Sequence, residues 1–207
     1  MIKAVIFDID GVLFDSFDAN LKFFQSLFTL AGHKPPAKED YQPLVHLSMH
    51  DVIKVLTNAS DEETKKIWEL GRSDKVPSVD HLIRMPKGIK ETILQLHKNY
   101  LLGIVTSRIK EKVYVAGLSE LQHCFEVAIA YQDTMNHKPH PEPLLLACKK
   151  LDIKPQDAVY IGDTESDVIA GKAAGMKVVN YTKNKYKNAD AHTYSFKELP
   201  KIIQKLA

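Results

Sequence analysis

The chain has 207 residues, of which 44% are apolar, and its 28 Lys and Arg residues against 26 Asp and Glu residues give a net charge of +2. This length and composition allow a hydrophobic core, and we expect one domain with an inserted module. Because so small a net charge provides no long-range field, neither a nucleic-acid partner nor a membrane partner is expected.

The amino terminus carries charges at Lys3, Asp8 and Asp10, which excludes the uninterrupted apolar stretch of a signal peptide. No span approaches the roughly 20 apolar residues of a membrane helix. Cys124 and Cys148 form no C-x-x-C pair and have the character of small buried side chains. A reduced, cytoplasmic protein is therefore expected, as either a monomer or a homodimer.

Short apolar runs rich in β-branched residues, each ending in polar residues, predict strands at 4–8, 101–106, 127–130, 158–162 and 177–180. Helical patterns separate the later runs, and this alternation is typical of a parallel sheet. Right-handed crossovers would give a doubly wound α/β domain with five or six strands. Ligands of such domains bind beyond the carboxyl ends of the strands.

Three apolar stripes with helical spacing predict helices at 87–99, 142–151 and 199–206 that cover the sheet. The stretch between the first two strands is far longer than an ordinary connection and contains no convincing strand. It shows amphipathic patterns at 21–31 and 52–56, and Ser60 to Glu63 form a capping box that would open a third helix. We therefore expect a core domain of residues 1–15 and 85–207, with an all-helical cap domain of residues 16–84 inserted in it.

The first predicted strand ends in Asp8-Ile9-Asp10-Gly11-Val12. Two carboxylates lie two residues apart where the chain leaves the sheet, and the glycine permits a tight turn. Such a pair favours a cation. The same pattern also occurs in surface turns and calcium loops, although the apolar strand before it argues against a calcium loop.

Two weaker signals follow at later strand ends. Thr106 and Ser107 could hold anionic oxygens, but hydroxyl residues at strand ends are also common turn formers. Lys138 lies in His137-Lys138-Pro139-His140-Pro141, where prolines stiffen the connection and could fix a cation for a phosphate. Alone, Lys138 would be interpreted as a solvated lysine.

The fourth predicted strand ends in Gly162-Asp163-Thr164-Glu165-Ser166-Asp167. Asp163 lies at the strand end itself, and Asp167 lies about one helical turn later. Magnesium prefers oxygen ligands of this kind. Asp167 could instead stabilise the helix dipole without taking part in any chemistry.

Taken in order, these segments resemble the four motifs of the haloacid dehalogenase superfamily and are similar to its phosphoglycolate phosphatase-like branch. The resemblance extends to Asp15-Ser16 and to 170–176, and it covers nearly all of the core but little of the cap. It implies a magnesium-dependent phosphatase that acts on a small phosphorylated metabolite, with phosphoglycolate as the default substrate. Other phosphomonoesters and pyrophosphate are alternatives.

The resemblance also implies roles for individual residues. Asp8 would be the nucleophile that forms an aspartyl-phosphate, and Asp10 the general acid and base. Asp8, the backbone carbonyl of Asp10 and Asp163 would hold Mg²⁺, with Asp167 acting indirectly. The phosphoryl oxygens would be bound by the remaining motif residues, Gly11, Thr106, Ser107 and Lys138.

Two other functions remain open. Val12 is compatible with a sugar-phosphate mutase of the same superfamily, but Asn20 stands where those mutases typically carry a histidine in the cap. A non-catalytic regulator that binds a phosphorylated ligand or a protein is the second alternative, since fold does not fix function. Dehalogenation is disfavoured because Asp10 and the acidic metal site suit phosphoryl transfer.

Overall fold

The computed structural model describes the backbone of residues 1–207 and all side chains except those of Glu111 and Ala116. The chain forms two compact units, one of Met1–Asp15 with Met85–Ala207 and one of Ser16–Arg84. We call them the sheet unit and the helical unit. Within the described residues, no helix has the length and apolar character needed to cross a membrane.

The sheet unit is built on six parallel strands in the order β3-β2-β1-β4-β5-β6. This topology confirms the predicted doubly wound α/β class. The strands agree with the predicted runs to within one residue at each end, apart from β6, which no run predicted. They are β1 (Ala4–Phe7), β2 (Leu101–Val105), β3 (Val127–Ile129), β4 (Ala158–Gly162), β5 (Lys177–Tyr181) and β6 (Ala191–Thr193).

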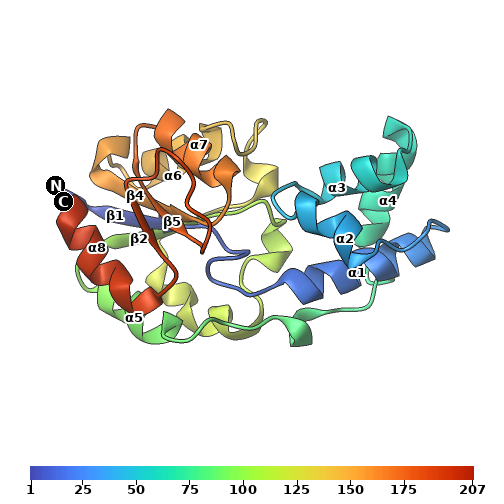
Figure 1. Cartoon of the computed structure of the whole chain (residues 1–207), viewed down its shortest axis with the longest axis horizontal. Helices are drawn as coiled ribbons and strands as arrows, with labels where there is room; N and C mark the ends of the chain where they lie inside the picture. The colour runs from blue at the N-terminus through green and yellow to red at the C-terminus, as the bar shows by residue number, and fades with distance from the viewer. The chain divides into compact units, whose positions relative to one another are not determined.

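Helices cover both faces of this sheet (Figure 1). On one face, α6 and α7 pack a cluster of buried residues that includes Ile6, Leu144 and Tyr160. On the other face, α5 and α8 lie against each other and bury Ile93 and Ile203 completely. These helices are α5 (Ile89–His97), α6 (Glu142–Lys150), α7 (Glu165–Ala173) and α8 (Leu199–Leu206).

The connection from β2 to β3 contains two 3-10 segments, Lys110–Lys112 and Ala116–Cys124, in place of an α-helix. Leu118 and Leu121 of the second segment are buried, and the segment packs against α5. Arg108 lies at the start of this connection, directly after the carboxyl end of β2.

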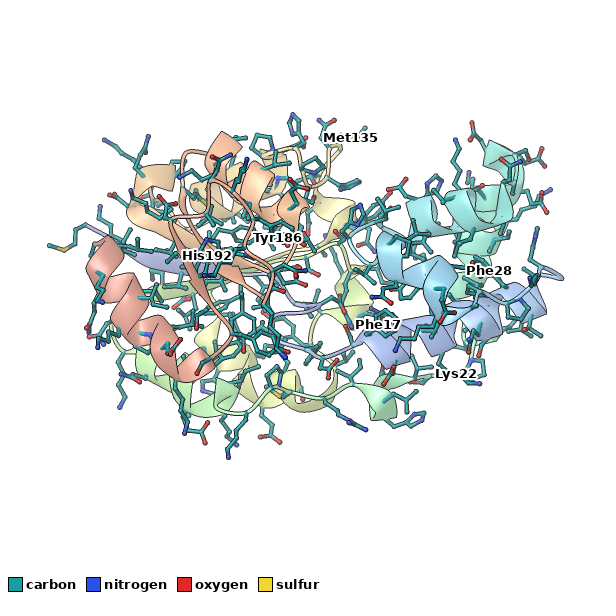
Figure 2. All side chains as sticks on the ribbon, in the orientation of Figure 1. Phe17, Lys22, Phe28, Met135, Tyr186 and His192 are labelled. Carbon is teal, nitrogen blue, oxygen red and sulfur yellow. The ribbon has the colours of Figure 1, made fainter. Side chains whose placement is uncertain are left out.

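The helical unit contains α1 (Phe17–Leu30), α2 (Lys38–Tyr41), α3 (Met49–Thr57) and α4 (Asp61–Gly71). Its apolar core includes Phe24, Phe28 and Ile53. Phe28 points toward the neighbouring helices of the unit, and Lys22 on the same helix points outward (Figure 2). Ser60, the predicted capping residue at the start of α4, accepts a hydrogen bond from the Glu63 amide at 3.3 Å.

The central position of β1 decides which residues meet at the carboxyl edge of the sheet. Phe7, the last residue of β1, is paired with Ile104 of β2 and Ile161 of β4. The residues that follow these strands therefore leave the sheet side by side. They are the predicted site residues Asp8, Thr106 and Asp163.

Candidate active site

Asp8 is fixed at the end of β1 by its backbone, whose amide donates to the Ile161 carbonyl at 2.9 Å. Only 7% of the residue is exposed. Burial raises the pKa of its carboxyl from 3.8 to about 7, and the nearby charges of Asp167 and Asp10 act in the same direction, while Lys138 opposes them. Asp8 is thus a nearly buried carboxyl that gives up its proton less readily than an ordinary aspartate.

Lys138 extends from the loop before α6 and places its ammonium between two carboxylates. Its Nζ lies 3.0 Å from Asp8 Oδ1 and 2.7 Å from Asp167 Oδ1. Burial alone would lower the pKa of Lys138, but the charges of Asp167 and Asp8 raise it well above its ordinary value. The side chain is therefore a permanently charged, buried cation, unlike the solvated lysine that its sequence context alone would suggest.

Asp167 holds the Lys138 ammonium in place, and both of its carboxylate oxygens accept hydrogen bonds. Its Oδ1 accepts hydrogen bonds from Lys138 and from the Tyr160 hydroxyl at 2.8 Å. Its Oδ2 accepts from the Thr164 hydroxyl at 2.7 Å and from the amides of Asp163 and Thr164. Burial would raise the pKa of Asp167, but Lys138 and these hydrogen bonds hold it below its usual value. Asp167 is an ionised anchor for Lys138.

Asp163 differs from Asp167 because its buried Oδ1 has no hydrogen-bond partner among the described residues. Burial raises the pKa of Asp163 well above its usual value, and the charges of Asp167 and Asp8 add to the effect. Carboxylate oxygens of Asp8, Asp163 and Asp167 lie within 4.8 Å of one another. An unsatisfied carboxylate oxygen in such a group fits a hard divalent cation, which would replace the missing hydrogen bonds.

Gly11 makes room for this arrangement. It has a φ of +77°, and a Cβ atom on it would lie 2.0 Å from Asp163 Oδ2. A side chain at position 11 is therefore excluded both by the backbone conformation and by the Asp163 carboxylate. The sequence suggested the tight turn, but only the structure reveals the close approach to Asp163.

Asp10 is paired with Arg108, which was not among the predicted site residues. Its two carboxylate oxygens each accept a hydrogen bond from Arg108 at 2.7 Å, Oδ2 from Nε and Oδ1 from Nη2. The Arg108 guanidinium also lies 5.2 Å from the centre of the Phe14 ring. Asp10 is thus held by a bidentate ion pair, the geometry in which arginine binds carboxylates most strongly.

Thr106 is buried at the carboxyl end of β2, with Ser107 partly exposed after it. The Thr106 hydroxyl oxygen accepts a hydrogen bond from the Arg108 amide at 3.2 Å. Because that oxygen already accepts, its own proton remains available to donate to an anionic oxygen.

The structure therefore gathers Asp8, Lys138, Asp163 and Asp167 in one contact network, and pairs Asp10 with Arg108. Two residues that contact this site, Arg108 and Tyr160, were not predicted from the sequence. Arg108 follows the Thr106-Ser107 pair directly, and its position just after a strand end is the one sequence signal that marks it as a cation near the site. Tyr160 lies inside an apolar strand, where no sequence signal separates a structural tyrosine from one that binds a site residue.

In doubly wound α/β domains, ligands bind beyond the carboxyl ends of the strands, which is where this sheet collects its carboxylates and the buried lysine. Residues 5–181 match the family model for haloacid dehalogenase-like hydrolases. The chain is 33% identical to the pyrophosphatase PpaX of Bacillus cereus strain Q1 over 180 residues, which cover 85% of this chain and 81% of the relative. The chain belongs to the haloacid dehalogenase-like hydrolase family, and it is an enzyme of that family.

Solved structures agree with this assignment. A hydrolase of the superfamily from Geobacter sulfurreducens, of subfamily IA, matches with 30% identity and a TM-score of 0.73, covering 100% of this chain and 97% of the other. A candidate phosphoglycolate phosphatase from Lactobacillus plantarum matches with 25% identity and a TM-score of 0.83 over the whole of both chains. The β-phosphoglucomutase of Clostridium difficile, at 23% identity and a TM-score of 0.84, covers 100% of this chain and 97% of the other and shows the shared fold.

Proposed function

We propose that this protein is a magnesium-dependent phosphatase that hydrolyses a small phosphorylated metabolite through an aspartyl-phosphate on Asp8. The main support is the placement of the Asp8 carboxylate, which lies at the carboxyl edge of the sheet within 3.0 Å of the buried Lys138 ammonium. A carboxylate held beside a fixed cation is well placed to attack a phosphoryl group whose charge the cation offsets.

In the proposed reaction, an Asp8 oxygen attacks phosphorus in line with the leaving group, and the bond to the leaving oxygen breaks. Asp10, two residues further along, protonates that oxygen. Asp10 then removes a proton from the water that attacks the phosphorus of the aspartyl-phosphate, which releases inorganic phosphate and restores Asp8. Burial strengthens the contact of Asp8 with Lys138, because hydration would weaken it, and this contact favours the ionised nucleophile although burial itself raises the pKa of Asp8.

The phosphoryl oxygens are bound in this proposal by the Thr106 hydroxyl, the Ser107 amide, the backbone at Gly11 and the Lys138 ammonium. Asp8, Asp163 and the backbone carbonyl of Asp10 would hold the metal. Bound there, Mg²⁺ would offset the repulsion between the carboxylates and the phosphoryl group. We assign Asp167 to holding Lys138 because five donors already occupy its two oxygens.

For the substrate, we propose a small phosphoric ester or anhydride. The candidate phosphoglycolate phosphatase of Lactobacillus plantarum and the pyrophosphatase PpaX of Bacillus cereus favour phosphoglycolate and pyrophosphate as the first compounds to test. We also propose that residues 16–84 serve as the cap domain, as the placement of this insertion between β1 and β2 suggests.

The test is phosphate release from phosphoglycolate, pyrophosphate, glucose 1-phosphate and other phosphomonoesters, with Mg²⁺ or with a chelator. We expect metal-dependent release that is lost in Asp8→Asn, a variant that keeps the shape of the side chain but removes the nucleophile. Circular dichroism and thermal melting would establish that the variant is folded. Retained turnover in folded Asp8→Asn would refute the assignment, and conversion of glucose 1-phosphate to glucose 6-phosphate would instead indicate a mutase.

A further inference from the structure

The Arg108 side chain is held in place from several sides at the carboxyl edge of the sheet. Its Nε and Nη2 atoms donate to Asp10, and its Nη1 atom donates to the Lys112 carbonyl at 3.2 Å. Only 12% of the side chain is exposed. The backbone amide of Arg108 is fixed by Thr106, and its carbonyl accepts from the Tyr131 amide at 2.9 Å. The guanidinium is thus preorganised beside two residues of the proposed reaction.

The pairing of Arg108 with Asp10 conflicts with the proposed role of Asp10 as general acid and base. Both carboxylate oxygens of Asp10 face the guanidinium, at 2.7 Å each, whereas proton transfer requires one of them to face the leaving oxygen of the substrate. At least one hydrogen bond of the pair must therefore be exchanged when a substrate binds. The Arg108 N–H group that is released can then donate to an anionic oxygen of the substrate.

We propose that Arg108 binds a second anionic group of the substrate, carried by the leaving group. This inference rests on the proposed phosphatase function and narrows its substrate class. Asp10 acts at the leaving oxygen, so the guanidinium beside it lies on the leaving-group side of the scissile bond. The planar fork of arginine matches a carboxylate or a phosphate. The substrates are therefore small phosphoric esters or anhydrides whose leaving group itself bears a carboxylate or a phosphate.

The experiment compares phosphoglycolate with ethyl phosphate, two alkyl phosphates with similar alkoxide leaving groups, of which only the first has a second anionic group. A third substrate, p-nitrophenyl phosphate, has a leaving group that needs no proton. The variants are Arg108→Gln, which removes the charge, and Arg108→Lys, which keeps the charge but loses the fork. Lys110→Gln is the matched control, because Lys110 lies in the same connection but pairs with Asp133 at 2.7 Å. Thermal melting establishes that each variant is folded.

We expect the kcat/KM of Arg108→Gln for phosphoglycolate to fall roughly 10- to 100-fold further than its kcat/KM for ethyl phosphate, with most of the difference in KM. Arg108→Lys should recover part of this loss, and Lys110→Gln should behave like the wild type. If kcat/KM fell equally for both alkyl phosphates and stayed unchanged for p-nitrophenyl phosphate, the proposal would be overturned. Arg108 would then serve only to orient Asp10.

Unchanged selectivity in Arg108→Gln would also overturn the proposal. If the wild type hydrolyses ethyl phosphate and p-nitrophenyl phosphate at least as well as phosphoglycolate and pyrophosphate, the phosphatase function stands and this inference fails. If the wild type releases phosphate neither from these compounds nor from the wider panel of phosphomonoesters and pyrophosphate, the phosphatase function itself fails. The two failures are therefore distinguishable.

Discussion

The ammonium nitrogen of Lys138 lies 2.7 Å from Oδ1 of Asp167, and 8% and 1% of the two side chains are exposed. Both charges are therefore almost completely withdrawn from water. Each depends on the other, because a buried ion that loses its partner carries the full cost of desolvation. The pair joins the loop before α6 to the first turn of α7, and it holds Lys138 against Asp8.

Lys138→Met should lower the free energy of unfolding by about 3–5 kcal/mol, because the variant leaves the Asp167 carboxylate buried without a cation. The measurement is urea unfolding at neutral pH. The double variant Lys138→Met with Asp167→Asn is the control, and it should recover part of the loss because no isolated charge remains. A single variant as stable as the wild type would contradict the view that the two charges depend on each other.

Tyr160→Phe should lower the free energy of unfolding by about 1–2 kcal/mol, since it removes the hydroxyl that donates to Asp167 and accepts from Lys138 at 3.1 Å. We also expect a lower kcat with little change in KM, because Lys138 would be held less firmly beside Asp8. Steady-state kinetics and urea unfolding on the same preparation would separate the two effects. A change in stability with unaltered kcat would limit Tyr160 to a structural role.

Gly11→Ala should abolish phosphatase activity, because its Cβ would displace the Asp163 carboxylate. Gly175→Ala is the matched control, since Gly175 has a similar φ of +82° but no atom within 4 Å of its Cβ position. In the control, only backbone strain should lower the free energy of unfolding, by about 1–2 kcal/mol, and the activity should be kept. Equal loss of activity in the two variants would show that strain, and not the contact with Asp163, is responsible.

The affinity for Mg²⁺ should rise between pH 6 and pH 8. The pKa of Asp8 is raised to about 7 in the metal-free protein, and that of Asp163 is raised as well, so protons compete with the metal below neutral pH. Titration calorimetry with Mg²⁺ alone should show proton release on binding at pH 6. Asp163→Asn should bind the metal more weakly at every pH. A pH-independent affinity would argue against these two carboxylates as ligands.

The metal-free protein should lose stability from Asp8 as the pH rises from 3.8 to about 7. The folded state keeps the proton on Asp8 over this range and the unfolded state releases it, so deprotonation favours unfolding. Asp8→Asn has no such proton, and its advantage in melting temperature over the wild type should grow between pH 4 and pH 8. Melting curves in the presence of a chelator would measure this difference. A constant difference would indicate an ordinary pKa for Asp8.

The regular part of the fold could be predicted from the sequence because burial on both faces leaves short but uninterrupted apolar runs in β1, β2 and β4. β6 could not, because Ala191–Thr193 is a three-residue edge strand with one buried residue. The 3-10 connection before β3 was also unpredicted, as its Leu118 and Leu121 resemble part of an ordinary helix.

For the candidate site, the strand-end acids were predictable because their positions follow from the topology. Their partners were not. The contact of Arg108 with Asp10 joins positions 98 residues apart, and the Tyr160 hydroxyl leaves an otherwise apolar cluster to reach Asp167. Such contacts depend on side-chain directions in three dimensions, which a linear pattern does not contain.

The central place of β1 also has a consequence for synthesis on the ribosome. Residues 4–7 are made before the other strands of the sheet, but one of the two neighbours of this strand is β4, whose residues 158–161 follow only after more than 150 further amino acids have been joined. Until then β1 has one unpaired edge. The Ile161 carbonyl, which accepts the hydrogen bond from the Asp8 amide, has not yet been made. A nascent chain that ends before β4 holds every residue of the first motif but lacks Asp163 and Asp167, so activity should appear only after β4 and the start of α7 have been made.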